Sequence, residues 1–243
     1  MDFSVRTGNL LHRSHLSFRK WVFAIYLISR PKGISSTQLA KDLDITQKTA
    51  WYLGHRIRHA CLDLKRKFLG TVEVDETFVG GKKSNKHRVS GQKFKRGWAE
   101  KVPVIGVYER GTKKIRTQVL DDMSHDTLCE PVYEWVYRDM QVYSDEHNAY
   151  KMLTGVYYHE FVKHSAKQYV KGDVHTNSLE NFWSLFKRGY MGTYHVMSPK
   201  HLWLYVREFT ARHNARPLGV YGFMKTIAQG MRGQRLQYQE LIA

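Results

Sequence analysis

Apolar residues recur with a helical period over the first quarter of the chain. This pattern predicts a helix over residues 17–29, ended by Pro31, then a short helix over residues 37–42 and a longer one over about 46–64. The positions that would pack between these helices are Trp21, Ile25, Ile28, Ile45, Ala50, Leu53 and Ile57.

The second and third of these helices are separated by a tight turn, an arrangement that favours a helix-turn-helix over about residues 35–60. Lys48, Arg56 and Arg58 are predicted to face outward, where they would contact DNA. The alternative is an ordinary helical hairpin whose basic face is only solvated.

Beyond Gly70 the pattern changes to the alternation of half-buried strands. Strands are predicted at residues 71–77, 103–108, 114–120, 141–144 and 158–162, and helices at 124–137, 148–153, 177–190, 199–214 and 220–230. We therefore expect a helical region over residues 1–69, followed over residues 70–243 by a mixed α/β sheet flanked by helices. This order of elements is that of an RNase H-like fold, with additional helices at the C-terminal end.

Composition adds a basic character to this outline. The chain has 243 residues, 42% of them hydrophobic, which is enough for a sizeable core and argues against disorder. Its formal net charge of +17 favours a polyanionic partner over a merely solvated basic surface. Many of the basic residues fall in one glycine-framed segment that we expect to bind DNA: Lys82, Lys83, Lys86, Arg88, Lys93, Lys95 and Arg96.

Several classes of protein are disfavoured. The two cysteines, Cys61 and Cys129, form no CxxC pair, so a disulfide framework or cysteine zinc site is not indicated, and a reducing cytoplasm is expected. The early apolar run at residues 21–28 is too short to span a membrane. No phosphate-binding glycine motif suggests a nucleotide cofactor.

Three carboxylates stand where a metal-dependent phosphodiester chemistry would need them. Asp75 lies in the first predicted strand, Asp145 ends the fourth, and Glu180 opens a later helix. If they converge, they can hold two Mg²⁺ ions, with Asp75 bridging both, so that one ion activates the attacking oxygen and the other stabilises the leaving oxygen. Each also has a structural alternative: a solvated strand face for Asp75, a turn for Asp145, and a capping box with Asn177 for Glu180.

The helix that carries Glu180 has an amphipathic pattern. Its apolar stripe consists of Leu179, Phe182, Trp183 and Phe186. Glu180 and Lys187 lie two turns apart on one side, next to this stripe. The carboxylate can then point at the sheet edge while the lysine reaches a substrate phosphate, although an exposed lysine on a helix is also common.

Three motifs in the second part of the chain resemble a known family. They are Val74–Gly81 (VDETFVGG), Ser144–Tyr150 (SDEHNAY) and His175–Gly189 (HTNSLENFWSLFKRG). In this order they resemble bacterial insertion-sequence transposases of the ISXO-like group, and the resemblance covers nearly the whole chain.

The resemblance implies a DDE-type catalytic domain of RNase H-like fold, with Asp75, Asp145 and Glu180 as its triad and Lys187 as the lysine that follows the glutamate. It also implies Mg²⁺, or Mn²⁺ in its place, as the cofactor. Some relatives have Asn at the third position, which leaves Asn177 as an alternative to Glu180. Relatives often begin with a cysteine zinc ribbon, whereas this chain has no ribbon cysteines, so no zinc is expected in it.

The function expected from sequence is therefore that of a DNA transposase. It would cleave phosphodiester bonds at transposon ends and transfer the 3′-hydroxyl into target DNA. Terminal inverted repeats and target DNA are the expected partners, contacted also by Arg188 beside Lys187, and a homodimer or higher assembly on DNA is expected. The alternatives are a catalytically inactive or domesticated DNA-binding protein and a nuclease of the same fold.

Overall fold

The computed structural model describes residues 6–80, 101–162, 170 and 172–243. The chain forms two compact units. The sheet unit comprises residues 65–187, and the helical unit comprises residues 1–64 together with residues 188–243.

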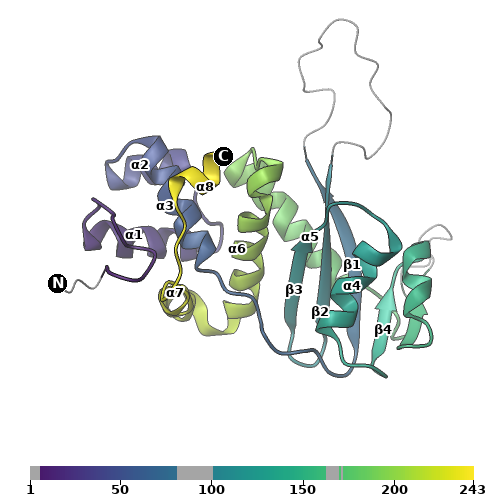
Figure 1. Cartoon of the computed structure of the whole chain (residues 1–243). Coiled ribbons are helices and arrows are strands. Elements are labelled where there is room, and N and C mark those ends of the chain that lie inside the picture. The colour runs from purple at the N-terminus through teal and green to yellow at the C-terminus, as the bar shows by residue number, and fades with distance from the viewer. Residues whose placement is uncertain (1–5, 81–100, 163–169, 171) are drawn as a thin grey trace, which may run out of the picture. The chain divides into compact units, whose positions relative to one another are not determined.

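The sheet unit is built on five strands in the order β3-β2-β1-β4-β5 (Figure 1). β1 pairs antiparallel with β2 and parallel with β4; β2 pairs antiparallel with β3, and β4 pairs parallel with β5. The strands are β1 (Val72–Val79), β2 (Val102–Glu109), β3 (Lys114–Val119), β4 (Gln141–Ser144) and β5 (Tyr158–Phe161). This is the mixed sheet of an RNase H-like fold, so the fold class predicted from sequence is confirmed.

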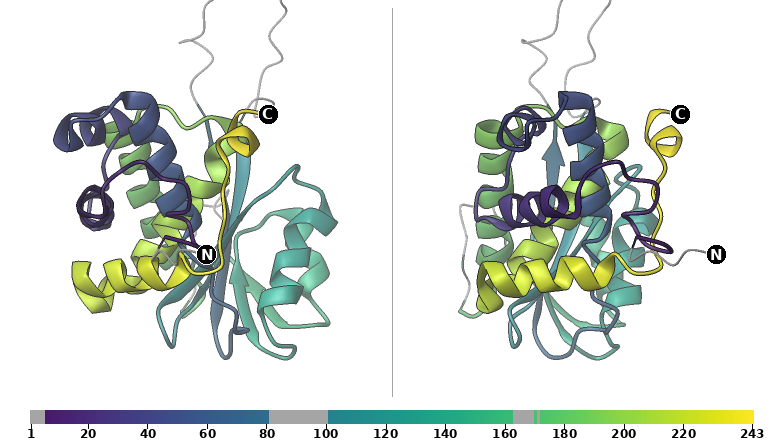
Figure 2. Two further views of the ribbon diagram at one scale, coloured as in Figure 1. Left: turned by 60° about the vertical axis from the view of Figure 1, so that its left-hand side comes forward. Right: turned by 90° about the vertical axis from the view of Figure 1, so that its left-hand side faces the viewer.

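Helices cover both faces of this sheet. α4 (His125–Trp135), whose N-cap Ser124 accepts the backbone N–H of Thr127, and α5 (Asn177–Gly189) lie on opposite faces (Figures 1 and 2). The predicted helix at residues 148–153 is the 3₁₀ helix η2 (Asn148–Leu153). The apolar stripe of α5 is buried as predicted, at Leu179, Phe182, Trp183 and Phe186.

A glycine in β2 allows α5 to lie close to the sheet. Gly106 pairs with Asp75 across the antiparallel ladder, so their side-chain directions share one face. A Cβ atom at Gly106 would lie 2.8 Å from Cζ2 of Trp183 and 2.9 Å from Cδ2 of Leu179. Both distances are shorter than van der Waals contact, so the missing side chain sets the depth at which α5 packs.

We expect Gly106→Ala to destabilise the protein by about 1–3 kcal/mol, because the added methyl group must push α5 from the sheet or force its rings off their rotamers. Urea unfolding followed by tryptophan fluorescence measures this change. Gly111→Ala is the matched control, since a Cβ there meets nothing within 4 Å. Equal midpoints for the two variants would contradict the role given to Gly106.

The helical unit joins helices from both ends of the chain. α1 (Phe18–Ser29), α2 (Ser36–Leu43) and α3 (Gln47–His59) come from the N-terminal part, and the last of them ends earlier than predicted. The remainder comes from the C-terminal part: η4 (Tyr190–Tyr194), η5 (Pro199–His201), α6 (Leu202–Ala215), η6 (Arg216–Leu218), α7 (Gly219–Gly230) and α8 (Tyr238–Ile242). The predicted division at residue 70 assigned these later helices to the catalytic domain instead.

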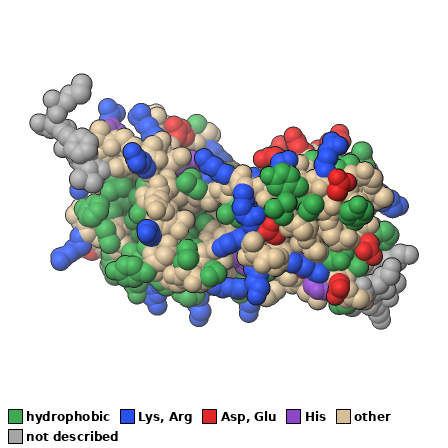
Figure 3. Space-filling model, turned by 90° about the horizontal axis from the view of Figure 1, so that it is seen from below, with side chains coloured by type: hydrophobic (Ala, Val, Ile, Leu, Met, Phe, Trp, Pro, Cys, Tyr) green, Lys and Arg blue, Asp and Glu red, His purple; other side chains and the backbone are tan. Residues whose placement is uncertain are grey.

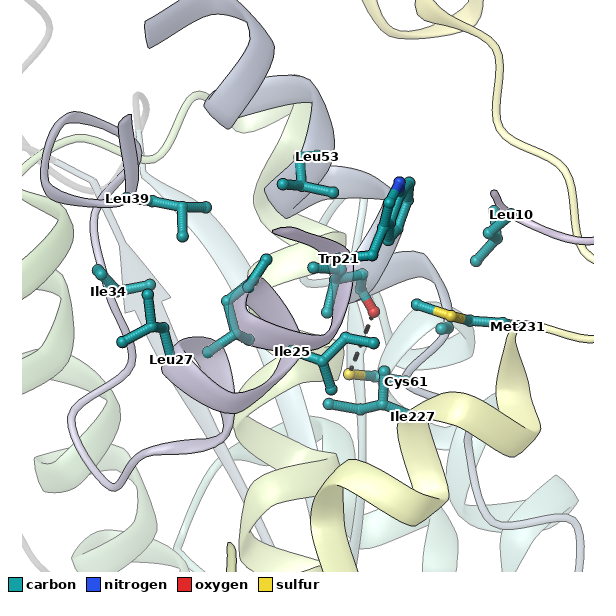
Figure 4. Packing of buried hydrophobic residues seen from close by; sticks show 14 of the residues in the cluster. Leu10, Trp21, Ile25, Leu27, Ile34, Leu39, Leu53, Cys61, Ile227 and Met231 are labelled. Atoms are coloured by element: carbon teal, nitrogen blue, oxygen red, sulfur yellow. Dashed lines mark hydrogen bonds between the residues drawn. The ribbon is translucent and has the colours of Figure 1, made fainter. Parts of the chain in front are cut away.

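The core of this unit explains that difference. Figure 4 shows Trp21 and Ile25 of α1 and Leu53 of α3 in one apolar cluster with Ile227 and Met231 from the C-terminal part. Gly230 lies against the backbone carbonyl of Ala60, a contact that leaves no room for a side chain. The N-terminal helices therefore bury their apolar faces against segments more than 140 residues away, which periodicity within one segment does not reveal.

A buried ionic cluster also joins α3 to α6. Glu208 has no exposed surface; it pairs with Arg58, whose Nε lies 2.6 Å from Oε2, and with Arg212 one turn along its own helix. The hydroxyl of Tyr194 donates to the same carboxylate at 2.7 Å. Burial alone would raise the pKa of Glu208, but Arg212, Arg58 and Tyr194 together hold it below its usual value.

Candidate active site

The sheet brings two of the predicted carboxylates to one place. β1 and β4 run parallel, with Val72 opposite Val142 and Glu73 opposite Tyr143. Continuing this register by two residues brings Asp75 level with Asp145, which lies just past the last residue of β4. The first turn after β4 fixes Asp145, because its Oδ1 accepts the backbone N–H of His147 at 3.0 Å.

A third carboxylate, which the sequence analysis did not select, completes the group. Asp75, Glu76 and Asp145 each offer an oxygen, and these oxygens lie within 4.8 Å of one another. All three side chains are half-buried. Glu76 directly follows Asp75 in β1, and strand alternation assigns neighbouring residues to opposite faces. That rule gave no reason to group it with Asp75.

Tyr150 holds Glu76 in this position. Its ring is fully buried, and its hydroxyl donates a 2.6 Å hydrogen bond to Oε2 of Glu76. Tyr150 lies in the 3₁₀ helix that follows the turn at Asp145, so one short segment fixes two of the three carboxylates. Its position in the Ser144–Tyr150 motif was the available signal, but no pattern within the sequence pairs it with Glu76.

Crowding of these groups perturbs their ionisation. Burial raises the pKa of Asp75 well above its ordinary value, and the nearby charges of Glu76, Asp145 and Glu180 raise it further. The pKa of Glu76 is also raised, first by burial and then by Asp145, against the opposing hydrogen bond from Tyr150. A positive charge among these oxygens would offset the repulsion.

Glu180 lies near this group without belonging to it. Its side chain is exposed in the first turn of α5, and its charge contributes to the raised pKa of Asp75. Its Oε1 lies 3.5 Å from the hydroxyl of Thr176, the residue just before the helix. Lys187 is exposed on the same helix.

Two residues expected to contact DNA are buried instead. Arg58 is 4% exposed because Glu208 of α6 binds it, and the prediction that it faces outward is wrong. Arg56 is also buried; its Nη2 donates to the carbonyl of His12 at 2.9 Å, and its guanidinium lies over the ring of Trp21. Helical periodicity alone could not show that other segments cover this side of α3.

The remaining basic candidates divide into two sets. Lys48 in the first turn of α3 is exposed, with Nζ 4.9 Å from the ring centre of Tyr238, and Arg188 at the end of α5 is exposed. Figure 3 shows lysine and arginine side chains scattered among apolar and acidic ones on the face seen from below. The others fall outside the described residues: Lys82, Lys83, Lys86, Arg88, Lys93, Lys95 and Arg96.

Comparison with known proteins decides the family. Residues 67–214, which include the whole carboxylate group, match the model of the ISXO2-like transposase domain. The chain belongs to this transposase family. It is also 30% identical over 221 residues to an uncharacterized protein in transposable element ISH50 of Halobacterium salinarum, a match that covers 86% of this chain and 74% of the relative.

A solved structure shows a weaker likeness. The crystal structure of a pre-cleavage Mos1 transpososome matches with a TM-score of 0.32 and 12% identity, covering 85% of this chain and 77% of that chain. A likeness of this size adds nothing to the fold assignment, which rests on the strand order. Within the described part of the chain, no helix is both long enough and apolar enough to cross a bilayer.

Membership of a transposase family identifies DNA as the partner and implies the use of a divalent metal ion. The donor set fits such an ion, because carboxylate oxygens are the ligands that hard divalent cations prefer. The raised pKa of Asp75 supports the fit, since burial and then the charges of Glu76, Asp145 and Glu180 disfavour its anionic form, and a cation beside it would offset both effects.

Proposed function

We propose that this transposase cleaves phosphodiester bonds at the ends of an insertion sequence and joins the freed 3′-hydroxyl to target DNA. The observation that carries this proposal is the convergence of Asp75, Glu76 and Asp145 in a domain of the transposase family. When bound, a pair of divalent cations such as Mg²⁺ supplies activation of the attacking oxygen and stabilisation of the leaving oxygen.

The side chains divide this work among them. The charges of both Asp145 and Glu180 act on Asp75, so Asp75 would hold a divalent cation together with these two carboxylates. Glu76, fixed by Tyr150, adds a further oxygen on the Asp145 side. Lys187, exposed on the helix of Glu180, would bind a phosphate of the scissile strand and orient it for in-line attack.

The protein would hold DNA chiefly through contacts with the phosphates. The helix-turn-helix formed by α2 and α3 would contact the terminal inverted repeats through Lys48, and Arg188 would extend the basic surface beyond Lys187. The net charge of +17 supports a binding constant that falls steeply with salt. Because two element ends must be brought together, we expect the active form to be a dimer or larger assembly on DNA.

A joining assay tests the proposal. The protein is incubated with Mg²⁺, a target plasmid and labelled DNA that carries the ends of its insertion sequence, with Asp145→Ala as the comparison. We expect joined products from the wild type and none from the variant, whose binding to end DNA should persist. Cleavage without joining would indicate a nuclease, and binding without either product would rule out the catalytic role.

A further inference from the structure

β1 carries a second buried carboxylate two residues before Asp75. Glu73 has no exposed surface. Residues two apart in a strand project to the same face, about 6.6 Å apart along the chain, so Glu73 and Asp75 both face α5. Glu73 is outside the metal-binding group formed by Asp75, Glu76 and Asp145.

The contacts of Glu73 are directed at the start of α5. Its Oε2 accepts the backbone N–H of Ser178 at 2.9 Å and that of Leu179 at 3.3 Å, and its Oε1 accepts the hydroxyl of Ser178 at 3.0 Å. These N–H groups belong to the first turn of α5, where no carbonyl of the same helix can accept them. A carboxylate from another element therefore caps this helix.

Arg110 extends the same attachment to the segment before the helix. Its Nε lies 2.8 Å from Oε1 of Glu73, while its Nη1 and Nη2 donate to the carbonyls of Asp173 and His175 at 2.8 and 2.9 Å. Arg110 follows the last residue of β2, so the chain from residue 173 to the first turn of α5 is bound to the central strands. At Gly106, α5 also packs directly against β2.

Glu180 directly follows Leu179 in this capped first turn. The position of Glu180 relative to Asp75 therefore depends on few contacts. Glu73 lies two residues before Asp75 in β1, and its capping hydrogen bonds hold Ser178 and Leu179, next to Glu180. A carboxylate that caps a helix also interacts favourably with the partial positive charge of its N-terminus, which strengthens this attachment.

We propose that Glu73 is a positioning residue that sets the distance between Glu180 and Asp75, and so determines how tightly Glu180 takes part in holding a divalent cation. This inference rests on the proposed function, because it takes Glu180 as a metal ligand. Glu73 itself is buried and lies outside the group of Asp75, Glu76 and Asp145.

Glu109 provides a matched control. It is also a buried carboxylate of the sheet, 2% exposed. It accepts hydrogen bonds from the guanidinium of Arg66 and, at 2.8 Å, from the backbone N–H of Leu69. It pairs with Val72, three positions along the ladder from Asp75. None of its described hydrogen bonds reaches α5. Glu109→Gln should therefore destabilise the protein much as Glu73→Gln does, without changing how Glu180 takes part in cation binding.

The test compares Glu73→Gln, Glu109→Gln and wild type by two measurements. The first, on protein without DNA, is the Mn²⁺ concentration that gives half of the cation-induced rise in melting temperature. The second is the Mn²⁺ concentration that gives half-maximal cleavage of element-end DNA. We expect Glu73→Gln to raise both by about 10- to 100-fold, the usual effect of losing a group that orients a ligand. Glu109→Gln should leave both unchanged.

Unchanged Mn²⁺ dependence in Glu73→Gln, or an equal shift in Glu109→Gln, would overturn the inference. If Glu73→Gln does not fold, Ser178→Ala takes its place; it removes one of the hydrogen bonds, and we expect a rise of about threefold, with no rise counting against the inference. Should the wild type bind Mn²⁺ but cleave nothing, the proposed function fails, while the measurement without DNA still tests the role of Glu73.

Discussion

Replacing Asp75 by Asn should reduce cleavage of element-end DNA by more than about 100-fold, which exceeds the loss typical of a group that only orients a ligand. Asp75 is central to the carboxylate group, since Glu76, Asp145 and Glu180 all act on its ionisation. An amide keeps the size of the side chain but removes the anionic oxygen that would bridge two cations. Cleavage in Mg²⁺ or Mn²⁺ measures the loss, and wild-type cleavage by the variant would remove Asp75 from the site.

The same substitution should stabilise the metal-free protein at neutral pH. Because the pKa of Asp75 is raised in the folded state, folding favours the protonated carboxyl, and stability is lost as pH rises from the unfolded value of about 3.9 towards the folded one. Asp75→Asn cannot ionise, so its melting temperature in EDTA should exceed that of the wild type at pH 7.

The pH dependence and the metal response provide the controls. The advantage of Asp75→Asn should shrink at pH 4–5, and the rise in melting temperature on adding Mn²⁺ should be largest in the wild type. Asp121→Asn, at an exposed position, should behave as the wild type throughout. A variant at position 75 that is less stable than the wild type at neutral pH would contradict the cost of burying an ionised Asp75 among these carboxylates.

The sheet could be predicted because its signals are local. Each strand shows its own alternation, and α5 shows its apolar stripe at Leu179, Phe182, Trp183 and Phe186, which the structure buries. The order of these elements along the chain then restricts how they combine, since three antiparallel strands followed by two crossovers form a mixed sheet. Asp75 and Asp145 could be selected for the same reason, as each is marked by its place in a strand.

The partners of these residues could not be found in this way. Glu76 joins the carboxylate group through Tyr150, which lies 74 residues further along the chain. Arg58 has the spacing of an outward-facing residue, yet Glu208, 150 residues away, buries it. In both cases a side-chain hydrogen bond over a long sequence separation overrides the local pattern, and one sequence contains no record of that pairing.

Glu208→Ala should have the largest effect on stability among the substitutions considered. It leaves the guanidinium groups of Arg58 and Arg212 buried without their shared carboxylate, and Tyr194 without its acceptor. Removing one partner from a buried ion pair typically costs about 3–5 kcal/mol, because the remaining charge is neither solvated nor compensated. The pKa of Glu208 lies below its ordinary value, so this stabilisation is present at neutral pH and is lost only as pH falls through the folded value.

Urea unfolding at pH 7 measures the change, with Asp42→Ala, an exposed acid of the same unit, expected to stay within about 0.5 kcal/mol of the wild type. Since Arg58 belongs to α3 and Glu208 to α6, the loss should loosen the helix-turn-helix from the C-terminal helices. Binding to element-end DNA should then weaken even though Arg58 does not face the solvent. A Glu208→Ala protein of wild-type stability would show that the two arginines find other compensation, and the ionic cluster would lose its role in joining the two ends of the chain.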